Sequence, residues 1–266
     1  MLKRFPVEAK GLHTTATLEC PNDEPGDEVV VLASGLGAPE LRGLRTELAS
    51  QGRAALSVIQ PRAGYMRGFG DVAELRARII EQAIKQARAR HGIGRSALIG
   101  HSLGGLDVVR VLDMAADPDQ IASLDLVASA GITKEHLART GLRLLHMGAS
   151  ELIRGNRRVV GRVVGTLLQN PLQFAAESGY GKREDLAARL SEIAGAVDTG
   201  VLEFEKDIVF PPRLTASAIE TLVAGGAIRA STTTLPDHAC HTTPLCDPAL
   251  TARVLDKTLA NRRSAR

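Results

Sequence analysis

The feature that most constrains the fold of this chain is the pentapeptide Gly100-His101-Ser102-Leu103-Gly104. It follows a short apolar run, Ala97-Leu98-Ile99, and it precedes a helical pattern over about residues 104–116. A serine between two glycines at such a strand-to-helix junction is the pattern of a nucleophile elbow, which holds a hydroxyl above a sheet. A Cβ on either flanking residue would meet the neighbouring strand or helix. An ordinary glycine-rich turn is the alternative, and the strand and helix around the motif favour the elbow.

Apolar runs and helical patterns alternate on both sides of this motif. Alternation of this kind is typical of a parallel sheet with helices on both faces. The sequence therefore predicts an α/β fold with a mostly parallel central sheet flanked by helices. The expected strands are 12–20 at an edge, 28–33, 54–59, 96–99, 121–129, 201–209 and 227–235. The expected helices are 40–51, 71–91, 104–116, 214–223 and 248–259.

The alternation is interrupted between residues 133 and 198, where the sequence shows several helical patterns and almost no strand-like run. A helical block inside an α/β alternation predicts an inserted helical lid. We therefore expect a core made of residues 1–132 and 199–266 and a lid (cap) made of residues 133–198. The many apolar side chains of this segment indicate a hydrophobic pocket for substrate, although packing against the core explains such side chains as well.

Composition excludes several classes of protein. The 33 basic and 30 acidic residues give a net charge of only +3, and no basic block points to nucleic acid. No apolar run approaches the ~18 residues of a membrane span, and residues 1–8 lack the apolar stretch of a secretory signal. The three cysteines are an odd number without a metal-type pair, so we expect free thiols and a cytoplasmic location.

An activated serine needs an orienting acid and a base, and in this architecture they follow it in the order Ser, acid, His. Asp207 is the leading acid because it lies at the carboxyl end of an expected strand, where such folds place their sites. Glu203 and Glu205 are the alternatives, and a surface carboxylate paired with a neighbouring cation is the plainer interpretation of Asp207.

The base is expected in the segment between the last strand and the last helix, where His241 and His238 lie three residues apart. The position favours His241, and chemistry alone leaves His238 open. A metal site made of His238, Cys240 and His241 is a further interpretation, but the sequence offers no second cluster of ligands to complete it.

The oxyanion hole of such a site uses the backbone N–H of the residue after the nucleophile, which here is Leu103. The second donor comes from the loop after an earlier strand, where Gly35-Leu36-Gly37 allows close approach of backbone to a ligand. The N–H of Leu36 is the expected donor. A simple turn is the alternative for these glycines.

At this point the chain resembles the α/β-hydrolase fold serine hydrolases. Gly-His-Ser-Leu-Gly-Gly at 100–105 is similar to the elbow of their esterase, lipase and thioesterase branches. The seven-residue step from His241 to Pro248 resembles the family's spacing between its histidine and the proline of the last helix, which favours His241 over His238. Asp207, followed by Ile-Val-Phe-Pro, resembles the family's acid loop.

The resemblance implies hydrolysis of a carboxylic ester or thioester through an acyl-enzyme on Ser102, with a hydrophobic small-molecule substrate and no metal or organic cofactor. The first alternative is a non-hydrolytic use of the same residues in acyl transfer, lyase chemistry or cofactor-free perhydrolysis. The second is a binding protein on a retired hydrolase scaffold, which the presence of all three reacting residues disfavours. The oligomeric state stays open, with a homo-oligomer as one alternative.

Overall fold

The centre of the computed structural model is a seven-stranded sheet in the order β1-β2-β4-β3-β5-β6-β7. Strands β4, β3, β5, β6 and β7 run parallel, whereas β1 and β2 join their neighbours antiparallel at one edge. The strands are β1 (Leu2–Ala9), β2 (Leu12–Glu19), β3 (Glu28–Ala33), β4 (Ala54–Val58), β5 (Arg95–His101), β6 (Ile121–Val127) and β7 (Thr199–Leu202). The structure describes residues 1–22, 25–35, 40–59, 72–132, 137–153, 156, 157, 160, 161, 185–229 and 240–264.

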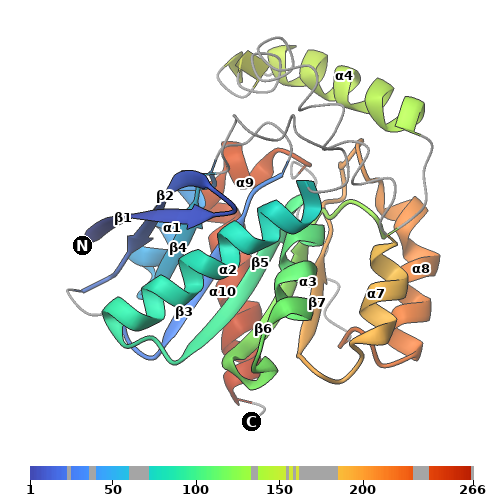
Figure 1. Ribbon diagram of the computed structural model, residues 1–266. Helices are drawn as coiled ribbons and strands as arrows, with labels where there is room; N and C mark the ends of the chain where they lie inside the picture. Colours follow the sequence, from blue (N-terminus) through green and yellow to red (C-terminus); the bar gives the residue numbers. More distant parts are fainter. Residues whose placement is uncertain are drawn as a thin grey trace.

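Helices cover both faces of the sheet (Figure 1). One face carries α2 (Val72–His91), α3 (Gly104–Met114), α7 (Leu186–Glu192) and α8 (Pro212–Ala224). The other face carries α1 (Arg42–Ser50) and α10 (Pro248–Ser264), with the short α9 (Thr243–Cys246) beside them. The mostly parallel, helix-flanked sheet expected from the sequence is therefore confirmed.

The side chains of the central strands explain this layering. In β3, Val29 and Val31 belong to the core beneath α2 and α3, while Val30 and Leu32 belong to the core beneath α1 and α10. All four are at most 2% exposed. Because successive residues of a strand point to opposite faces, a continuous apolar run is what a sheet covered on both faces requires.

The amino-terminal strand β1 was not expected from the sequence. Its residues Phe5, Val7 and Ala9 are buried and alternate with exposed neighbours, which is the pattern of a half-buried strand. Pro6 is one of these exposed neighbours, and a proline argues against a central strand. The edge position of β1 resolves the conflict, because a proline on an edge strand removes no hydrogen bond that the sheet needs.

The expected strands at 201–209 and 227–235 need correction. Strand β7 begins earlier and ends at Leu202, and the chain then bends through residues 203–210. Residues 227–229 form no strand, and residues 230–235 lie outside the described part of the chain. The helix expected to end at Gly92 does so: this residue has φ of +67°, and its N–H donates to the carbonyl of Arg88.

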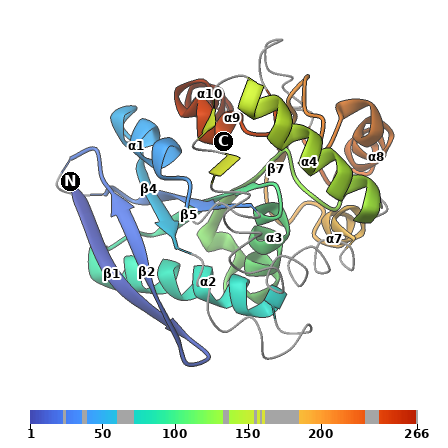
Figure 2. The same cartoon turned by 90° about the horizontal axis from the view of Figure 1, so that it is seen from above.

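The expected lid range contains two described helices with different surroundings. Helix α4 (Leu137–Ile153) lies beyond the carboxyl ends of the strands (Figures 1 and 2). Helix α7, in contrast, packs in the layer of α3 and α8, and its Leu186 and Leu190 are fully buried in that core. Most of the remaining lid range, residues 162–184, lies outside the described residues. Of the described helices, none combines the length and apolarity needed to cross a membrane.

Candidate active site

Ser102 lies in a tight turn between β5 and α3. Its φ of +56° falls in the left-handed region, which is costly for a residue with a side chain. The turn is possible because of its glycines: a Cβ on Gly100 would lie 2.5 Å from the carbonyl oxygen of Gly104 and from the Cα of Gly105. A Cβ on Gly104 would lie 2.7 Å from the carbonyl carbon of Ala33. The local geometry is thus that of an elbow in which close packing requires glycine.

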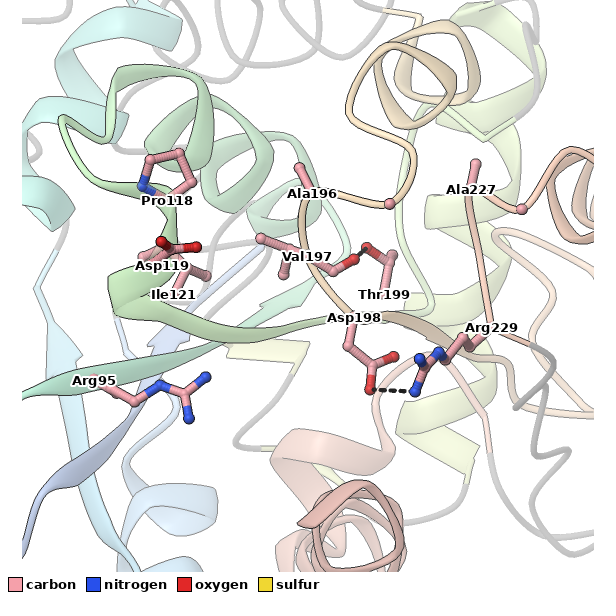
Figure 3. Close-up of a pocket in the computed structure, with 12 residues that line it drawn as sticks. Arg95, Pro118, Asp119, Ile121, Ala196, Val197, Asp198, Thr199, Ala227 and Arg229 are labelled. Atoms are coloured by element: carbon pink, nitrogen blue, oxygen red, sulfur yellow. Dashed lines mark hydrogen bonds and ion pairs between the residues drawn. The ribbon is translucent and has the colours of Figure 1, made fainter. Parts of the chain in front are cut away.

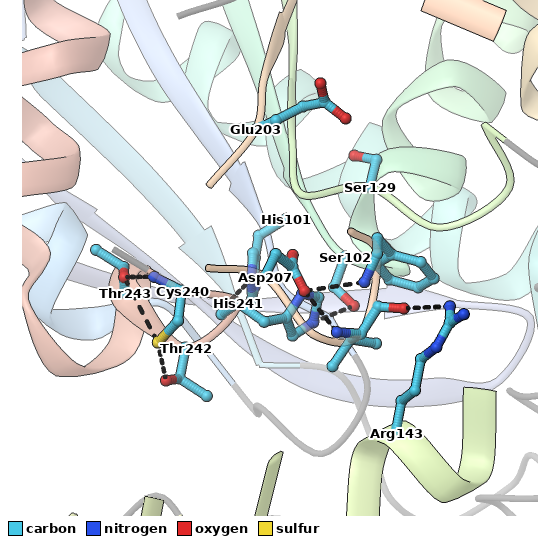
Figure 4. A network of polar contacts seen from close by, with 12 residues as sticks. His101, Ser102, Ser129, Arg143, Glu203, Asp207, Cys240, His241, Thr242 and Thr243 are labelled. Carbon is cyan, nitrogen blue, oxygen red and sulfur yellow. Dashed lines mark hydrogen bonds and ion pairs between the residues drawn. The ribbon is translucent and has the colours of Figure 1, made fainter. Parts of the chain in front are cut away.

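Three of the expected site residues come together at this turn (Figure 4). The Nε2 atom of His241 is 3.1 Å from the Oγ atom of Ser102, and its Nδ1 atom is 2.9 Å from Oδ2 of Asp207. All three residues are at most 8% exposed. Because a carboxylate only accepts, Nδ1 carries a proton, and Nε2 is then free to accept the proton of the serine hydroxyl. The arrangement has the geometry of a nucleophile, a base and an orienting acid.

The segment after β7 holds the Asp207 carboxylate in place. Its Oδ1 atom accepts hydrogen bonds from the backbone N–H groups of Val209 at 2.7 Å and Phe210 at 2.9 Å, which leaves Oδ2 for His241. The Phe210 ring also packs edge-on against the imidazole, with ring centroids 5.4 Å apart. Both the carboxylate and the imidazole therefore have one fixed orientation.

The alternative acids have other surroundings. Glu203 is 8% exposed, and its carboxyl group contacts the hydroxyl of Thr215. Burial, aided by the charge of Asp207, raises the pKa of Glu203, while the Thr215 hydrogen bond opposes that rise. Glu205 is exposed. Among these carboxylates, Asp207 is the one that contacts His241.

The alternative base, His238, lies outside the described residues, so the structure offers no comparison with His241. The same holds for the metal interpretation of His238 with Cys240 and His241. Over the part of the chain that the structure describes, no group of three or more His, Cys, Asp or Glu side chains has the arrangement of a metal site.

His101 precedes the serine and points into the fold. Its ring is 3% exposed and lies 5.1 Å from the ring of His241, centroid to centroid. Its Nε2 atom is 2.9 Å from the carbonyl oxygen of His241, so this nitrogen carries the proton and donates. Burial, reinforced by the charge that His241 can carry, lowers the pKa of His101 to about 3. The residue is neutral at ordinary pH and holds the backbone of His241.

We expect this buried imidazole to make the free energy of unfolding depend on pH. Between pH 6.5 and pH 3 the unfolded chain binds a proton at His101 and the folded chain does not, so stability falls as the pH falls. The contribution is on the order of 2 kcal/mol in the free energy of unfolding between pH 6.5 and pH 5. Urea denaturation of the wild type and His101→Gln at pH 7, 6 and 5 measures it, with exposed His13→Gln as the control. Equal pH dependence in all three proteins would contradict the expectation.

Of the two expected oxyanion donors, Leu103 adjoins the elbow in sequence and is described. Leu103 lies directly before α3, where backbone N–H groups lack intrahelical acceptors and the helix dipole favours negative charge. Leu36 lies outside the described residues. Its neighbour Gly35 shows how closely the chain after β3 approaches the nucleophile: a Cβ there would lie 2.6 Å from Cβ and 3.0 Å from Oγ of Ser102.

Helix α4 contacts both segments that carry the partners of Ser102. Arg143 donates to the carbonyl oxygen of Val209 at 3.3 Å (Figure 4). The carboxylate of Glu151, which is 1% exposed, accepts from the thiols of Cys240 at 3.6 Å and Cys246 at 3.7 Å. Burial raises the pKa of the Cys246 thiol to about 11, so it stays a donor. Sequence reasoning missed Arg143 and Glu151, whose spacing of eight residues gives no signal of a helical side-chain pair.

A separate cavity of about 320 Å³ lies at the amino ends of the parallel strands, at the other end of the sheet from the elbow (Figure 3). It is lined by the first residues of three strands, Arg95, Ile121 and Thr199, and by an ion pair between Arg229 and Asp198. The carboxyl ends of these strands point to the elbow, so the cavity is distinct from the site around Ser102.

Comparisons with known proteins show similarity in structure. No family model matches the sequence, and the search of curated proteins found no match. An esterase from Thermogutta terrifontis superposes with a TM-score of 0.67 at 16% identity, over 98% of this chain and 99% of that one. A hydrolase from Pseudomonas aeruginosa superposes with a TM-score of 0.66 at 19% identity, over 97% and 98% of the two chains. A 2-hydroxy-6-oxo-6-phenylhexa-2,4-dienoate hydrolase from Rhodococcus gives 0.67 at 18% identity, over 97% of each chain.

The chain has the α/β-hydrolase fold. In an α/β-hydrolase the carboxyl ends of the parallel strands form the side on which ligands bind. Ser102, Asp207 and His241 all lie on that side, after β5, after β7 and before α9 respectively.

Proposed function

We propose that this α/β-hydrolase cleaves a carboxylic ester or thioester through an acyl-enzyme on Ser102. The observation that carries the proposal is the hydrogen-bonded line from Ser102 through His241 to Asp207. Two further features support it: Ser102 lies on a strained elbow, and the acid is held by two backbone N–H groups. Strain at a buried hydroxyl that faces a base is the arrangement expected of an activated nucleophile.

In the proposed reaction, Oγ of Ser102 attacks the acyl carbon while its proton moves to Nε2 of His241. Asp207 stabilises the imidazolium, and the backbone N–H groups of Leu103 and Leu36 bind the oxyanion. His241 then returns the proton to the departing alcohol or thiol, which leaves the acyl group on Ser102. A water that gives its proton to His241 attacks this ester. Collapse of the second intermediate releases the acid while His241 returns this proton to Oγ of Ser102, which restores the starting state.

For the acyl group we propose an apolar pocket beneath α4, which would act as the lid. The side chain of Met147 is 5% exposed and that of Leu144 is half-buried on this helix. The substrate would thus be a small molecule with a hydrophobic acyl portion. Cys20, Cys240 and Cys246 are free thiols, which favours the reducing cytoplasm as the compartment.

Turnover of p-nitrophenyl esters from acetate to laurate, with acyl thioesters in parallel, tests the proposal. We expect hydrolysis with an optimum in chain length, and loss of at least about 10³-fold in kcat in Ser102→Ala. A fluorophosphonate probe should label Ser102 in the wild type, as mass spectrometry would show. Ser129→Ala is the matched control, because this buried hydroxyl donates to the Gly100 carbonyl and not to His241.

Three results would contradict the proposal. Turnover that survives in Ser102→Ala would mean that another group is the nucleophile. Labelling of Ser102 without hydrolysis of any ester or thioester would favour a non-hydrolytic enzyme, such as an acyl transferase. Absence of both labelling and turnover would favour a binding protein.

A further inference from the structure

We propose that Arg76 is a positioning residue for this site: its guanidinium, fixed by Asp107, holds the Ser34–Gly35 peptide against Ser102. The inference rests on the proposed hydrolase function, because its effect is on the backbone that binds the oxyanion. No atom of Arg76 is proposed to touch substrate.

The guanidinium of Arg76 binds two groups at once, a carboxylate and a backbone carbonyl. Its Nε atom is 2.9 Å and 3.0 Å from the two carboxylate oxygens of Asp107, and its Nη2 atom is 2.6 Å from one of them. The same Nη2 donates to the carbonyl oxygen of Ser34 at 2.9 Å. Arg76, Asp107 and Ser34 are at most 2% exposed, so water competes for none of these bonds. A rigid fork held by a buried carboxylate has one orientation.

The three bonded residues come from the three elements that surround the nucleophile. Arg76 lies near the start of α2, Asp107 lies in the first turn of α3 just after the elbow, and Ser34 directly follows β3. The Arg76 side chain thus ties the chain after β3 to the helix that carries the elbow. A shift of either element relative to the other would break one of these bonds.

The bond to Ser34 controls the backbone next to the nucleophile. A peptide unit is planar, so fixing the Ser34 carbonyl also fixes the direction of the Gly35 N–H. Gly35 approaches so closely that a Cβ on it would lie 2.6 Å from Cβ of Ser102. Rotation of this peptide therefore changes the space around Oγ of Ser102 and the course of the chain toward the expected oxyanion donor. Placement errors of a fraction of an ångström matter at such a site.

A contribution to folding stability does not explain well why Arg76 and Asp107 form a buried ion pair. A buried ion pair loses hydration, and apolar side chains of similar volume stabilise a fold as well or better. An apolar pair, however, offers no donor to the Ser34 carbonyl. Because Asp107 neutralises the arginine, the guanidinium acts at this position as a directional donor and does not attract an anionic substrate.

The test replaces both charges together, since Arg76→Met with Asp107→Leu removes both members of this buried ion pair. We expect kcat for the preferred ester to fall about 10-fold to 100-fold with KM within twofold. The inhibition constant of an alkyl trifluoromethyl ketone, whose adduct with Ser102 carries an oxyanion, should rise by a similar factor. A residue with a structural role only would not raise this constant in proportion to the loss of kcat.

Arg88→Met is the matched control. Arg88 lies at the other end of α2 and donates to the Gln120 carbonyl at 2.9 Å, near the amino ends of the strands. We expect a comparable change in melting temperature and an unchanged kcat. Equal kcat values in the double variant and in Arg88→Met would overturn the inference, as would a rise in KM without a fall in kcat.

A second variant covers the case in which the double variant does not fold. Arg76→Lys keeps a cation beside Asp107 but has a single ammonium group, which cannot reproduce the fork toward both Asp107 and Ser34. It should fold and lose at least about fivefold in kcat, and full activity would overturn the inference. Failure of the proposed function is separate: the wild type would then hydrolyse no ester, Ser102 would stay unlabelled, and the role of Arg76 would fall with it.

Discussion

Replacing His241 by alanine is expected to lower kcat for ester hydrolysis by at least about 10³-fold, because Ser102 would lose the imidazole that contacts its hydroxyl and can take its proton. The melting temperature should change little by comparison, since the imidazole lies at the edge of the core. Steady-state kinetics on the preferred p-nitrophenyl ester measure the loss. His13→Ala, on the exposed side of β2, is the control for removing an imidazole.

Asp207→Asn should lower kcat by about 10²-fold to 10⁴-fold while the fold persists. An asparagine that turns its amide N–H groups toward Nδ1 favours the tautomer with the proton on Nε2. The imidazole would then donate toward Ser102 where it needs to accept. Activity within tenfold of the wild type in both variants would refute the proposed roles. Loss in His238→Ala together with retention in His241→Ala would move the base to His238.

The second large effect concerns the elbow. Gly104→Ala is expected to lower the free energy of unfolding by about 3 kcal/mol or more, because the new Cβ would overlap the backbone of Ala33. The atoms that this Cβ would meet belong to the backbone of Ala33 and Ser34, and not to a flexible side chain that could move aside. The helix α3 would have to shift from β3, and the Ser102 hydroxyl would shift with it. Urea denaturation followed by circular dichroism measures the change.

Gly148→Ala is the matched control for this substitution. Gly148 lies within α4, and a Cβ there would meet nothing within 4 Å. Because glycine weakens a helix interior relative to alanine, this variant should be stabilised by about 0.5–1 kcal/mol. A loss of less than about 1 kcal/mol in Gly104→Ala would show that the elbow tolerates a side chain.

Much of the fold followed from local pattern. The apolar run of β3 and the glycine-flanked serine after β5 predicted a parallel sheet with a nucleophile at a sharp turn. Strand β1 was not predicted: it contains Pro6, which a sheet tolerates only at positions such as an edge, and the edge position is a property of the folded sheet. The end of β7 was misplaced because the apolar residues around Asp207 continue the run while the chain itself bends.

The site residues were harder to predict from the sequence than the fold, for a physical reason. Spacing put Asp207, Glu203 and Glu205 within five residues of one another, and only the three-dimensional course of the chain decides which carboxylate reaches His241. The Arg76–Asp107 pair had no local signal at all. An arginine near the start of a charged helix is expected to be solvent-exposed from the sequence alone, and its burial depends on the helix packed against it.

The residues around Ser102 are joined across a long stretch of chain. Ser102 and His241 are 139 residues apart, and Ser102 reaches its base only after the segments that follow β6 and β7 have taken their places. Contacts so distant in sequence form late in folding, since the entropy lost on closing the intervening loop must be recovered first. A chain emerging from the ribosome would therefore carry an inert serine until its last third has been synthesised and docked. Onset of reactivity toward a serine-directed probe would then mark completion of the fold itself.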